Sequence, residues 1–334
     1  MLQTVGRNTW LYAKRKEIRI MKKIFITENG AVKQIEKPQQ DCWISLINPT
    51  EAEMSEILAN FDIDADNLRA ALDEEERSRI EVEDNYTMMI INIPAVEDRG
   101  EKDQWYDTIP LSFIMLKDMI ITVCLEETPI LDAFMNGRVR DFDTHMRTRF
   151  ILQLLYKNSL LFLQYLHEID KKSDVLEDKL QGSTQNRELA ALLKLEKSLV
   201  YFTTALSSNE LVLEKLLKNE NIKKYEDDMD FLEDVIVENK QAIEMTNIYS
   251  GILSGMMDAF ASVISNNLNM VMKFLTVLTT VMAIPTMIFS AYGMNTALSG
   301  MPFTTSQYGF IIVIAFSLVV SLIVALILIK KKII

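Results

Sequence analysis

Two long apolar runs close the 334-residue chain, and a short loop separates them. Phe274 to Tyr292 and Gly309 to Ile329 contain no charged residue. As helices they would be about 29 and about 32 Å long, so each is long enough to cross a hydrocarbon core of ~30 Å. The pattern predicts two membrane-spanning helices in a transmembrane domain over 267–334.

Upstream of the first span, apolar residues recur at helical spacing over a long stretch. No proline occurs between Pro129 and Pro285. The pattern predicts a stalk domain over 141–266, for which a plain coiled-coil stalk is the simplest interpretation. Long helices are expected near 141–181, 185–220 and 226–292, the last running into the membrane.

The N-terminal part alternates strand-like and helix-like stretches. Asn48-Pro49-Thr50 opens a helix through Leu58, with Thr50 as N-cap and Glu53 three residues on. Apolar, β-branched runs ended by turn residues indicate strands. We therefore expect an α/β domain over 21–140, with a mixed sheet flanked by helices. The strands are expected at 23–27, 42–47, 86–93, 109–116 and 119–125.

Basic residues flank the two spans on one side only. Lys273 precedes the first span, and the loop from Asn295 to Tyr308 has no Lys or Arg. By the positive-inside rule both termini are cytoplasmic, and the loop 293–308 is external. The chain is expected to be a multi-pass protein of the inner or plasma membrane. The lysines that follow the second span are Lys330, Lys331 and Lys332.

The start of the chain predicts no signal peptide, because residues 1–20 are basic and have no apolar core of the required length. We interpret these residues as a dispensable extension of the cytoplasmic α/β domain.

The formal net charge of −12 narrows the classes of partner. An acidic surface repels nucleic acid and suits a protein that handles cations. The two cysteines, Cys42 and Cys124, have no CxxC spacing, so neither a disulfide framework nor a soft-metal site is expected. No nucleophile–base pair, P-loop or Gly-rich phosphate motif is found, so we expect neither an enzyme nor a small-molecule substrate.

One face of the first span is polar. Its residues recur at alternating steps of three and four, and therefore share one side of a helix. Small hydroxyl groups at bilayer depth indicate either tight helix packing or a water-filled pore. A pore requires a ring of subunits, because one helix cannot enclose it. The face is formed by Asn269, Met272, Thr276, Thr279, Ala283, Thr286 and Ser290.

The tripeptide Gly293-Met294-Asn295 ends this helix, and its place between two C-terminal spans after a large acidic domain resembles the CorA family of divalent-cation channels. The resemblance implies a homopentameric funnel in the lipid bilayer that conducts hydrated Mg²⁺. It assigns the tripeptide to the selectivity filter, and it matches Asn269, Met272, Leu275 and Thr286 to pore-lining positions. The match covers most of the chain and is specific in its C-terminal part.

The chemistry of Mg²⁺ fits neutral acceptors, because this ion gives up its water reluctantly. Backbone carbonyls and the Asn295 amide oxygen can accept hydrogen bonds from the ion's own water shell. We expect Gly293 to end the helix in a left-handed or otherwise open turn. Pro285 frees one carbonyl inside the span, which pore water or Thr286 could satisfy.

One departure from the family concerns the outer loop, which has no Asp or Glu from Thr296 to Tyr308. Many relatives carry an acidic residue there, so the ion preference is open, and Co²⁺ or Ni²⁺ are alternative cargoes. The zinc-transporting branch of the family has Val at the middle position of the tripeptide, and Met294 argues against that alternative. A membrane-anchored helical scaffold that conducts nothing is a further alternative.

A regulatory metal site is implied by the same resemblance. Phe231 to Val235 resembles a family segment whose Asp joins a carboxylate of a neighbouring subunit in holding Mg²⁺. This assigns the role to Asp234, and we nominate Asp84 as its partner. High cytoplasmic Mg²⁺ would then hold the ring closed. The basic residues Lys273, Lys330, Lys331 and Lys332 are expected to bind lipid headgroups, or alternatively to form a basic ring at the ion exit.

Overall fold

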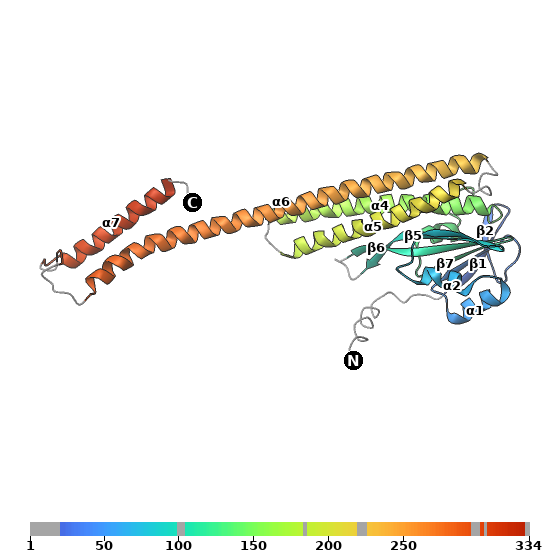
Figure 1. Ribbon diagram of the computed structural model, residues 1–334, viewed down its shortest axis with the longest axis horizontal. Helices are drawn as coiled ribbons and strands as arrows, with labels where there is room; N and C mark the ends of the chain where they lie inside the picture. Colours follow the sequence, from blue (N-terminus) through green and yellow to red (C-terminus); the bar gives the residue numbers. More distant parts are fainter. Residues whose placement is uncertain are drawn as a thin grey trace. The chain divides into compact units, whose positions relative to one another are not determined.

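The computed structural model describes residues 21–98, 104–182, 186–218, 226–294, 301–303 and 306–330 (Figure 1). The chain divides into two units, Met1–Met256 and Met257–Ile334, and each is described by itself. Residues 1–20 of the expected extension, Asn295 of the tripeptide, and Lys331 and Lys332 lie outside the described residues.

A seven-stranded mixed sheet in the first unit confirms the predicted α/β fold. Its strand order is β2-β1-β3-β7-β6-β5-β4. All neighbouring strands are antiparallel except β3 and β7, which are parallel. The strands are β1 (Met21–Glu28), β2 (Ala31–Ile35), β3 (Trp43–Ile47), β4 (Arg79–Val82), β5 (Tyr86–Asp98), β6 (Gln104–Leu116) and β7 (Ile120–Cys124).

The central strands are buried on both faces. Every residue of β3 and of β7 is buried, which is the pattern of strands covered by helices on both sides. Ile44 and Leu46 belong to a core that includes Met54 and Ile57 of α1 (Glu51–Asn60). The side chain of Trp43 lies in an aromatic cluster, with its ring centroid 5.1 Å from that of Phe150. The sheet is thus the middle of three layers.

Local capping explains where the short helices begin. Thr50 and Glu53 form the predicted capping box of α1, with the Thr50 N–H donating to Glu53 Oε2 at 2.8 Å. Asp64 caps α2 (Ala65–Arg69) by accepting from the N–H of Asp66 at 2.8 Å. The sequence did not predict α2, its 3₁₀ extension η2 (Ala70–Leu72) or α3 (Pro129–Met135).

Two long helices, α4 (Arg147–Gly182) and α5 (Asn186–Lys218), cover the second face of the sheet, and the first part of a third, α6 (Glu226–Tyr292), packs on these two helices (Figure 1). The predicted helices are confirmed, although α4 begins six residues after the expected position. The ring of Phe231 fixes the start of α6 on α4, because it lies 5.5 Å from Tyr156 and under the guanidinium of Arg149.

The second unit holds the end of α6 and α7 (Gly309–Lys330). Both helices are long and apolar enough to cross a membrane, as the sequence predicted. The turn before α7 requires glycine at 309, because a Cβ there would lie 2.2 Å from the Phe303 carbonyl oxygen. The Tyr292 hydroxyl donates to the Pro302 carbonyl at 3.1 Å and ties the end of α6 to this turn.

Candidate functional site

The polar face of α6 is exposed along its whole length in the second unit. All seven residues of the face, from Asn269 to Ser290, are exposed. Leu275, which was also matched to the pore, is 45% exposed, and Met272 is 55% exposed. A face intended only for packing within this chain would be covered by another helix of the chain. The polar face of α6 is therefore available to other chains, to water or to ions.

The opposite face of α6 is the one that α7 covers. On α6, Val277 is 8% exposed, and Val281, Ile284, Ile288 and Tyr292 are partly buried. The buried residues of α7 are small and follow one side of that helix, which allows close approach of two backbones. They are Gly309, Val313, Ser317 and Ser321. Contact with α7 thus covers part of the apolar face of α6 and none of its polar face.

Threonine hydroxyls on the polar face donate their hydrogens to backbone carbonyls of α6 itself. Thr276 donates to the Met272 carbonyl at 2.8 Å, Thr279 to the Leu275 carbonyl at 2.9 Å, and Thr286 to the Met282 carbonyl at 3.0 Å. Each hydroxyl has one donor and two acceptor lone pairs, so the oxygen presents only acceptors outward. A row of neutral acceptors matches the outward-pointing hydrogens of a hydrated cation.

One residue of this kind was missed from the sequence. Thr280 is exposed beside the polar face, and its hydroxyl donates to the Thr276 carbonyl at 2.7 Å. It falls outside the strict alternation of three- and four-residue steps, which is why the pattern did not include it.

Of the two partners suggested for the carbonyl freed by Pro285, Thr286 does not serve. Pro285 has no N–H, so the carbonyl of Val281 loses its intrahelical donor. The Thr286 hydroxyl donates to Met282 instead, because a threonine side chain reaches the carbonyl four residues before its own position.

Gly293 ends α6 without a left-handed turn. Its N–H donates to the carbonyls of Phe289 at 3.0 Å and Ser290 at 3.1 Å. Among the described glycines, positive φ angles occur at Gly30 and Gly137. A Cβ at position 293 would meet its nearest atoms, both carbonyl oxygens, at 3.5 Å, which is ordinary contact. Nothing within the described part of this chain requires glycine there. Met294 is 61% exposed.

The polar face continues toward the start of the second unit. Asp258, Ser262 and Ser265 precede Asn269 at steps of four, three and four, and all three are exposed. The Ser262 hydroxyl donates to the Asp258 carbonyl at 3.0 Å. The sequence pattern could have included this carboxylate, but the stripe was expected to begin at Asn269.

The two carboxylates assigned to regulation lie on different elements of the first unit. Asp234 is exposed on α6, and Asp84 is exposed in the turn between β4 and β5. Among the described residues, no group of three or more His, Cys, Asp or Glu side chains is placed to hold a metal ion. Within the described residues, Asp84 and Asp234 therefore belong to no such group.

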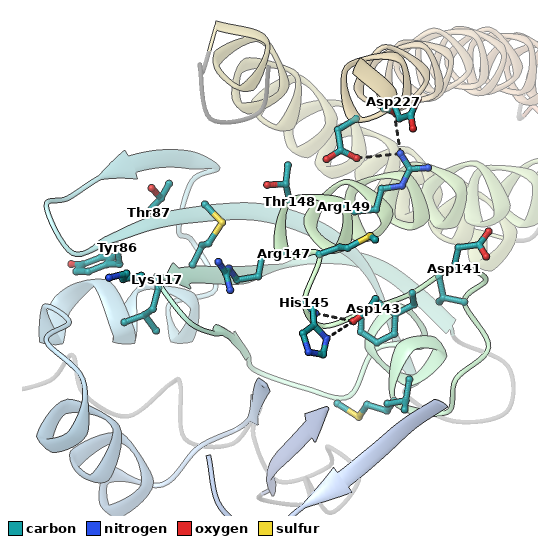
Figure 2. Close-up of a pocket in the computed structure, with 18 of the residues that line it drawn as sticks. Tyr86, Thr87, Lys117, Asp141, Asp143, His145, Arg147, Thr148, Arg149 and Asp227 are labelled. Atoms are coloured by element: carbon teal, nitrogen blue, oxygen red, sulfur yellow. Dashed lines mark hydrogen bonds and ion pairs between the residues drawn. The ribbon is translucent and has the colours of Figure 1, made fainter. Parts of the chain in front are cut away.

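A cleft of about 1530 Å³ opens beside the turn that carries Asp84. Figure 2 shows Arg149 directed toward Asp227 and His145 directed toward Asp143 in this cleft. Asp84 lines it, whereas Asp234 is not among the lining residues. The cleft was not predicted, because its residues come from the sheet, the segment between α3 and α4, the start of α4 and the start of α6.

The structure describes two of the lysines that flank the spans, Lys273 and Lys330. Lys273 is exposed on α6, and Lys330 is the last residue of α7 and also exposed. A helix C-terminus favours cationic side chains, so Lys330 suits its position whether or not it binds lipid.

Known proteins resemble this chain both in sequence and in fold. The family model described as CorA-like Mg²⁺ transporter protein matches residues 38–331. A cobalt/magnesium transport protein of Methanocaldococcus jannaschii is 27% identical over 290 residues, which cover 84% of this chain and 87% of that protein. A magnesium transport protein of Campylobacter jejuni is 27% identical over 330 residues, which cover 92% of this chain and 97% of that protein.

The fold likeness extends over nearly the whole chain. The complete structure of the magnesium transporter from Methanocaldococcus jannaschii matches with a TM-score of 0.80 at 23% identity, covering 95% of this chain and 100% of that one. The full-length CmaX protein matches with a TM-score of 0.67 at 13% identity, covering 93% and 99%.

Proposed function

The chain belongs to the CorA-like Mg²⁺ transporter family, and from this membership we propose that it transports divalent cations across a membrane, with Mg²⁺ as the main cargo. The ion passes along the polar face of α6 and through a filter at Gly293, Met294 and Asn295. Relatives named as magnesium and as cobalt/magnesium transport proteins support this class of cargo.

One observation carries the proposal. The acceptor-lined face of α6 is the face that α7 leaves uncovered, and it runs from Asp258 to the tripeptide that ends the helix. Mg²⁺ holds its water tightly, so recognition of the hydrated ion avoids the cost of dehydration. Threonine oxygens accept hydrogen bonds from that water shell, while the exposed Met272 and Leu275 form a constriction that closes by dewetting.

A single α6 cannot enclose a pathway, so the functional unit is a ring of identical chains. The family resemblance supports five subunits. The absence of Lys and Arg from loop 295–308 supports an external loop and cytoplasmic termini. Lys273 and Lys330, with Lys331 and Lys332, anchor the inner ends of the spans to lipid headgroups.

Two features attract cations in place of an acidic outer loop. The C-terminal end of a long helix carries partial negative charge, and several such ends meet at the filter of a ring. At the other end of the face, Asp258 contributes one carboxylate per chain. These groups concentrate divalent ions without binding them tightly at the filter.

Regulation by cytoplasmic Mg²⁺ uses carboxylates of two chains. Asp234 of one protomer and Asp84 of the next repel one another until a hard divalent cation lies between them. The two carboxylates lie on different elements, and we place the metal between protomers, where it stabilises the closed ring.

Co²⁺ is the second cargo that we propose, because a cobalt/magnesium transport protein is among the relatives. Neutral oxygen acceptors recognise the water shell rather than the metal, so they discriminate weakly between ions of similar hydration. Ni²⁺ follows by the same reasoning.

Uptake of Mg²⁺ into proteoliposomes tests the proposal. With low Mg²⁺ on the cytoplasmic side, the wild-type protein is expected to admit Mg²⁺, and Asn295→Ala is expected to lose most of the flux because the filter loses its amide oxygens. Asn247→Ala serves as the control, because Asn247 is exposed on α6 away from the filter. Equal flux in the wild type and Asn295→Ala, or none from the wild type, would overturn the proposal.

A further inference from the structure

A cluster of buried amide side chains lies where the sheet meets the long helices. Asn92 is in β5 just beyond the end of β4, because the last registered pair of the two strands is Arg79 with Ile90. The N–H and the carbonyl of Asn92 both point away from β6, toward the side that β4 no longer covers. Side chains must therefore satisfy the peptide groups of Asn92 at this edge.

Asn209 of α5 pairs with the peptide of Asn92 as a neighbouring strand would. Its Oδ1 accepts from the Asn92 N–H at 2.9 Å, and its Nδ2 donates to the Asn92 carbonyl at 2.8 Å. Asn158 of α4 donates to the same carbonyl at 3.1 Å, and the Ser78 hydroxyl donates to Asn209 Oδ1 at 2.8 Å. Both helices are thereby held on the strand that leaves the β4–β5 turn.

A second buried amide connects α5 to α6. Asn239 is 2% exposed, and its Nδ2 donates to the Leu206 carbonyl at 3.2 Å. Leu206 lies three residues before Asn209 on α5. Hydrogen bonds thus run from the β4–β5 hairpin through α5 to α6 within the first unit.

The β4–β5 hairpin and α6, which these hydrogen bonds connect through α5, carry the two carboxylates that we propose for regulation. Asp84 is in the turn of the β4–β5 hairpin, and Asp234 precedes Asn239 by five residues on α6. Apolar side chains would fill the same space without needing partners, whereas an amide binds only in one orientation. The amides therefore fix the placement of these elements in a way that apolar packing alone would not.

We propose that Asn92, Asn209 and Asn239 are positioning residues that hold Asp84 and Asp234 of one protomer at a fixed offset, so that both carboxylates meet their neighbours around a closed ring. The inference rests on the proposed function, since it concerns inhibition by cytoplasmic Mg²⁺. In a ring, any freedom of α6 to move relative to the β4–β5 hairpin is present in every subunit. A loosened α6 must also be ordered when Mg²⁺ binds, which weakens the apparent affinity for the ion.

Asn239→Leu is the variant of choice. The Leu206 carbonyl keeps its helical donor, so the substitution leaves no buried group unpaired. Asn209→Leu would remove two hydrogen bonds to the buried Asn92 peptide at once and endanger folding. Asn247→Leu is the matched control, because it is the same substitution at an exposed position of α6.

Flux through the full-length protein is measured as a function of cytoplasmic Mg²⁺. For Asn239→Leu, the half-inhibitory concentration is expected to rise about twofold to tenfold, as for the loss of one net hydrogen bond, while flux without cytoplasmic Mg²⁺ is unchanged. The control is expected to match the wild type. An unchanged half-inhibitory concentration, or a loss of flux at all Mg²⁺ concentrations, would overturn the inference.

Hydrogen exchange separates this inference from the proposed function. Peptides covering 226–245 are expected to exchange faster in Asn239→Leu than in the control, whether or not the protein transports ions. Equal exchange would refute the positioning role even if wild-type flux is inhibited by Mg²⁺. Faster exchange with wild-type flux that ignores Mg²⁺ would instead refute the proposed regulation, and the inference with it.

Discussion

A threonine in a membrane-spanning helix usually bonds its own backbone, and this habit decides what its oxygen offers to a neighbour. In α6, Thr276, Thr279 and Thr286 all donate to carbonyls four residues earlier. Their outward lone pairs can accept from water but cannot donate to an anion. At the scale of single residues, these threonine oxygens therefore offer the acceptors that the water shell of a cation requires.

Asp258 is the one carboxylate on this face within the described part of the second unit. We expect Asp258→Asn to lower Mg²⁺ flux about tenfold at low ionic strength and by less in high salt, because charge focusing at a pore is screened. Initial uptake rates into proteoliposomes check this. Asp178→Asn, an exposed carboxylate of α4, is the control, and equal losses in both variants would contradict a local role for Asp258.

At the scale of elements, the long helices could be predicted because their signals are local. Unbroken apolar periodicity predicted α4, α5 and α6, and the capping box fixed the start of α1 at Thr50. The short strands β2 and β4 could not be predicted in this way. Only partly buried or exposed residues make up β2, and β4 has four residues at the sheet edge. Such strands form because a partner strand is present, which a single-sequence pattern does not reveal.

The candidate site, too, was predictable only where its signals are local. The polar face of α6 follows from helical spacing alone, so it was predictable. The conformation of Gly293 and the partner of Thr286 depend on hydrogen bonds at a helix end and at a proline, where several acceptors compete. The amide contacts of Asn92 and Asn209 join residues 117 positions apart, which no local pattern indicates.

The two spans and their loop define a topology that can be checked directly. We expect a cysteine introduced by Ser306→Cys to react with a membrane-impermeant maleimide on intact cells, because the positive-inside rule predicts an external loop. Ser207→Cys, at an exposed position of α5, should react only after the membrane is permeabilised. Reaction of both or of Ser207→Cys alone in intact cells would contradict this orientation.

At the scale of the whole molecule, the proposed ion pathway and the proposed regulatory metal site both require identical chains that meet in a ring. The described part of a single chain leaves the polar face of α6 uncovered, and in it Asp84 and Asp234 belong to no group of three or more His, Cys, Asp or Glu side chains that could hold a metal ion. Sequence reasoning predicts that a ring is needed but not which residues meet across it, because those contacts are absent from any one chain. The pairing of Asp234 with Asp84 remains a prediction.

Asp234→Ala tests the regulatory part of this account. Removing one carboxylate per bridge leaves the divalent ion with fewer oxygen ligands, so we expect currents that persist at cytoplasmic Mg²⁺ concentrations that close the wild type. A patch-clamp titration measures this. Glu214→Ala, at an exposed position of α5, should behave as the wild type. Inhibition of Asp234→Ala at wild-type concentrations would discard the assignment.

The central claim is that ions pass along the uncovered face of α6, and cysteine block tests it. The two native cysteines are not expected to react with a thiol reagent. Cys42 and Cys124 are buried, and burial raises the pKa of the Cys124 thiol to about 12. Thr279→Cys places a thiol on the polar face, and Leu322→Cys places one on the exposed outer side of α7.

Mg²⁺ uptake is measured in proteoliposomes before and after treatment with a positively charged methanethiosulfonate reagent. We expect block of Thr279→Cys, because the added group fills the pathway and repels cations, and unchanged uptake by Leu322→Cys and the wild type. Unblocked uptake by a Thr279→Cys protein that mass spectrometry shows to be fully labelled would contradict a pathway along this face.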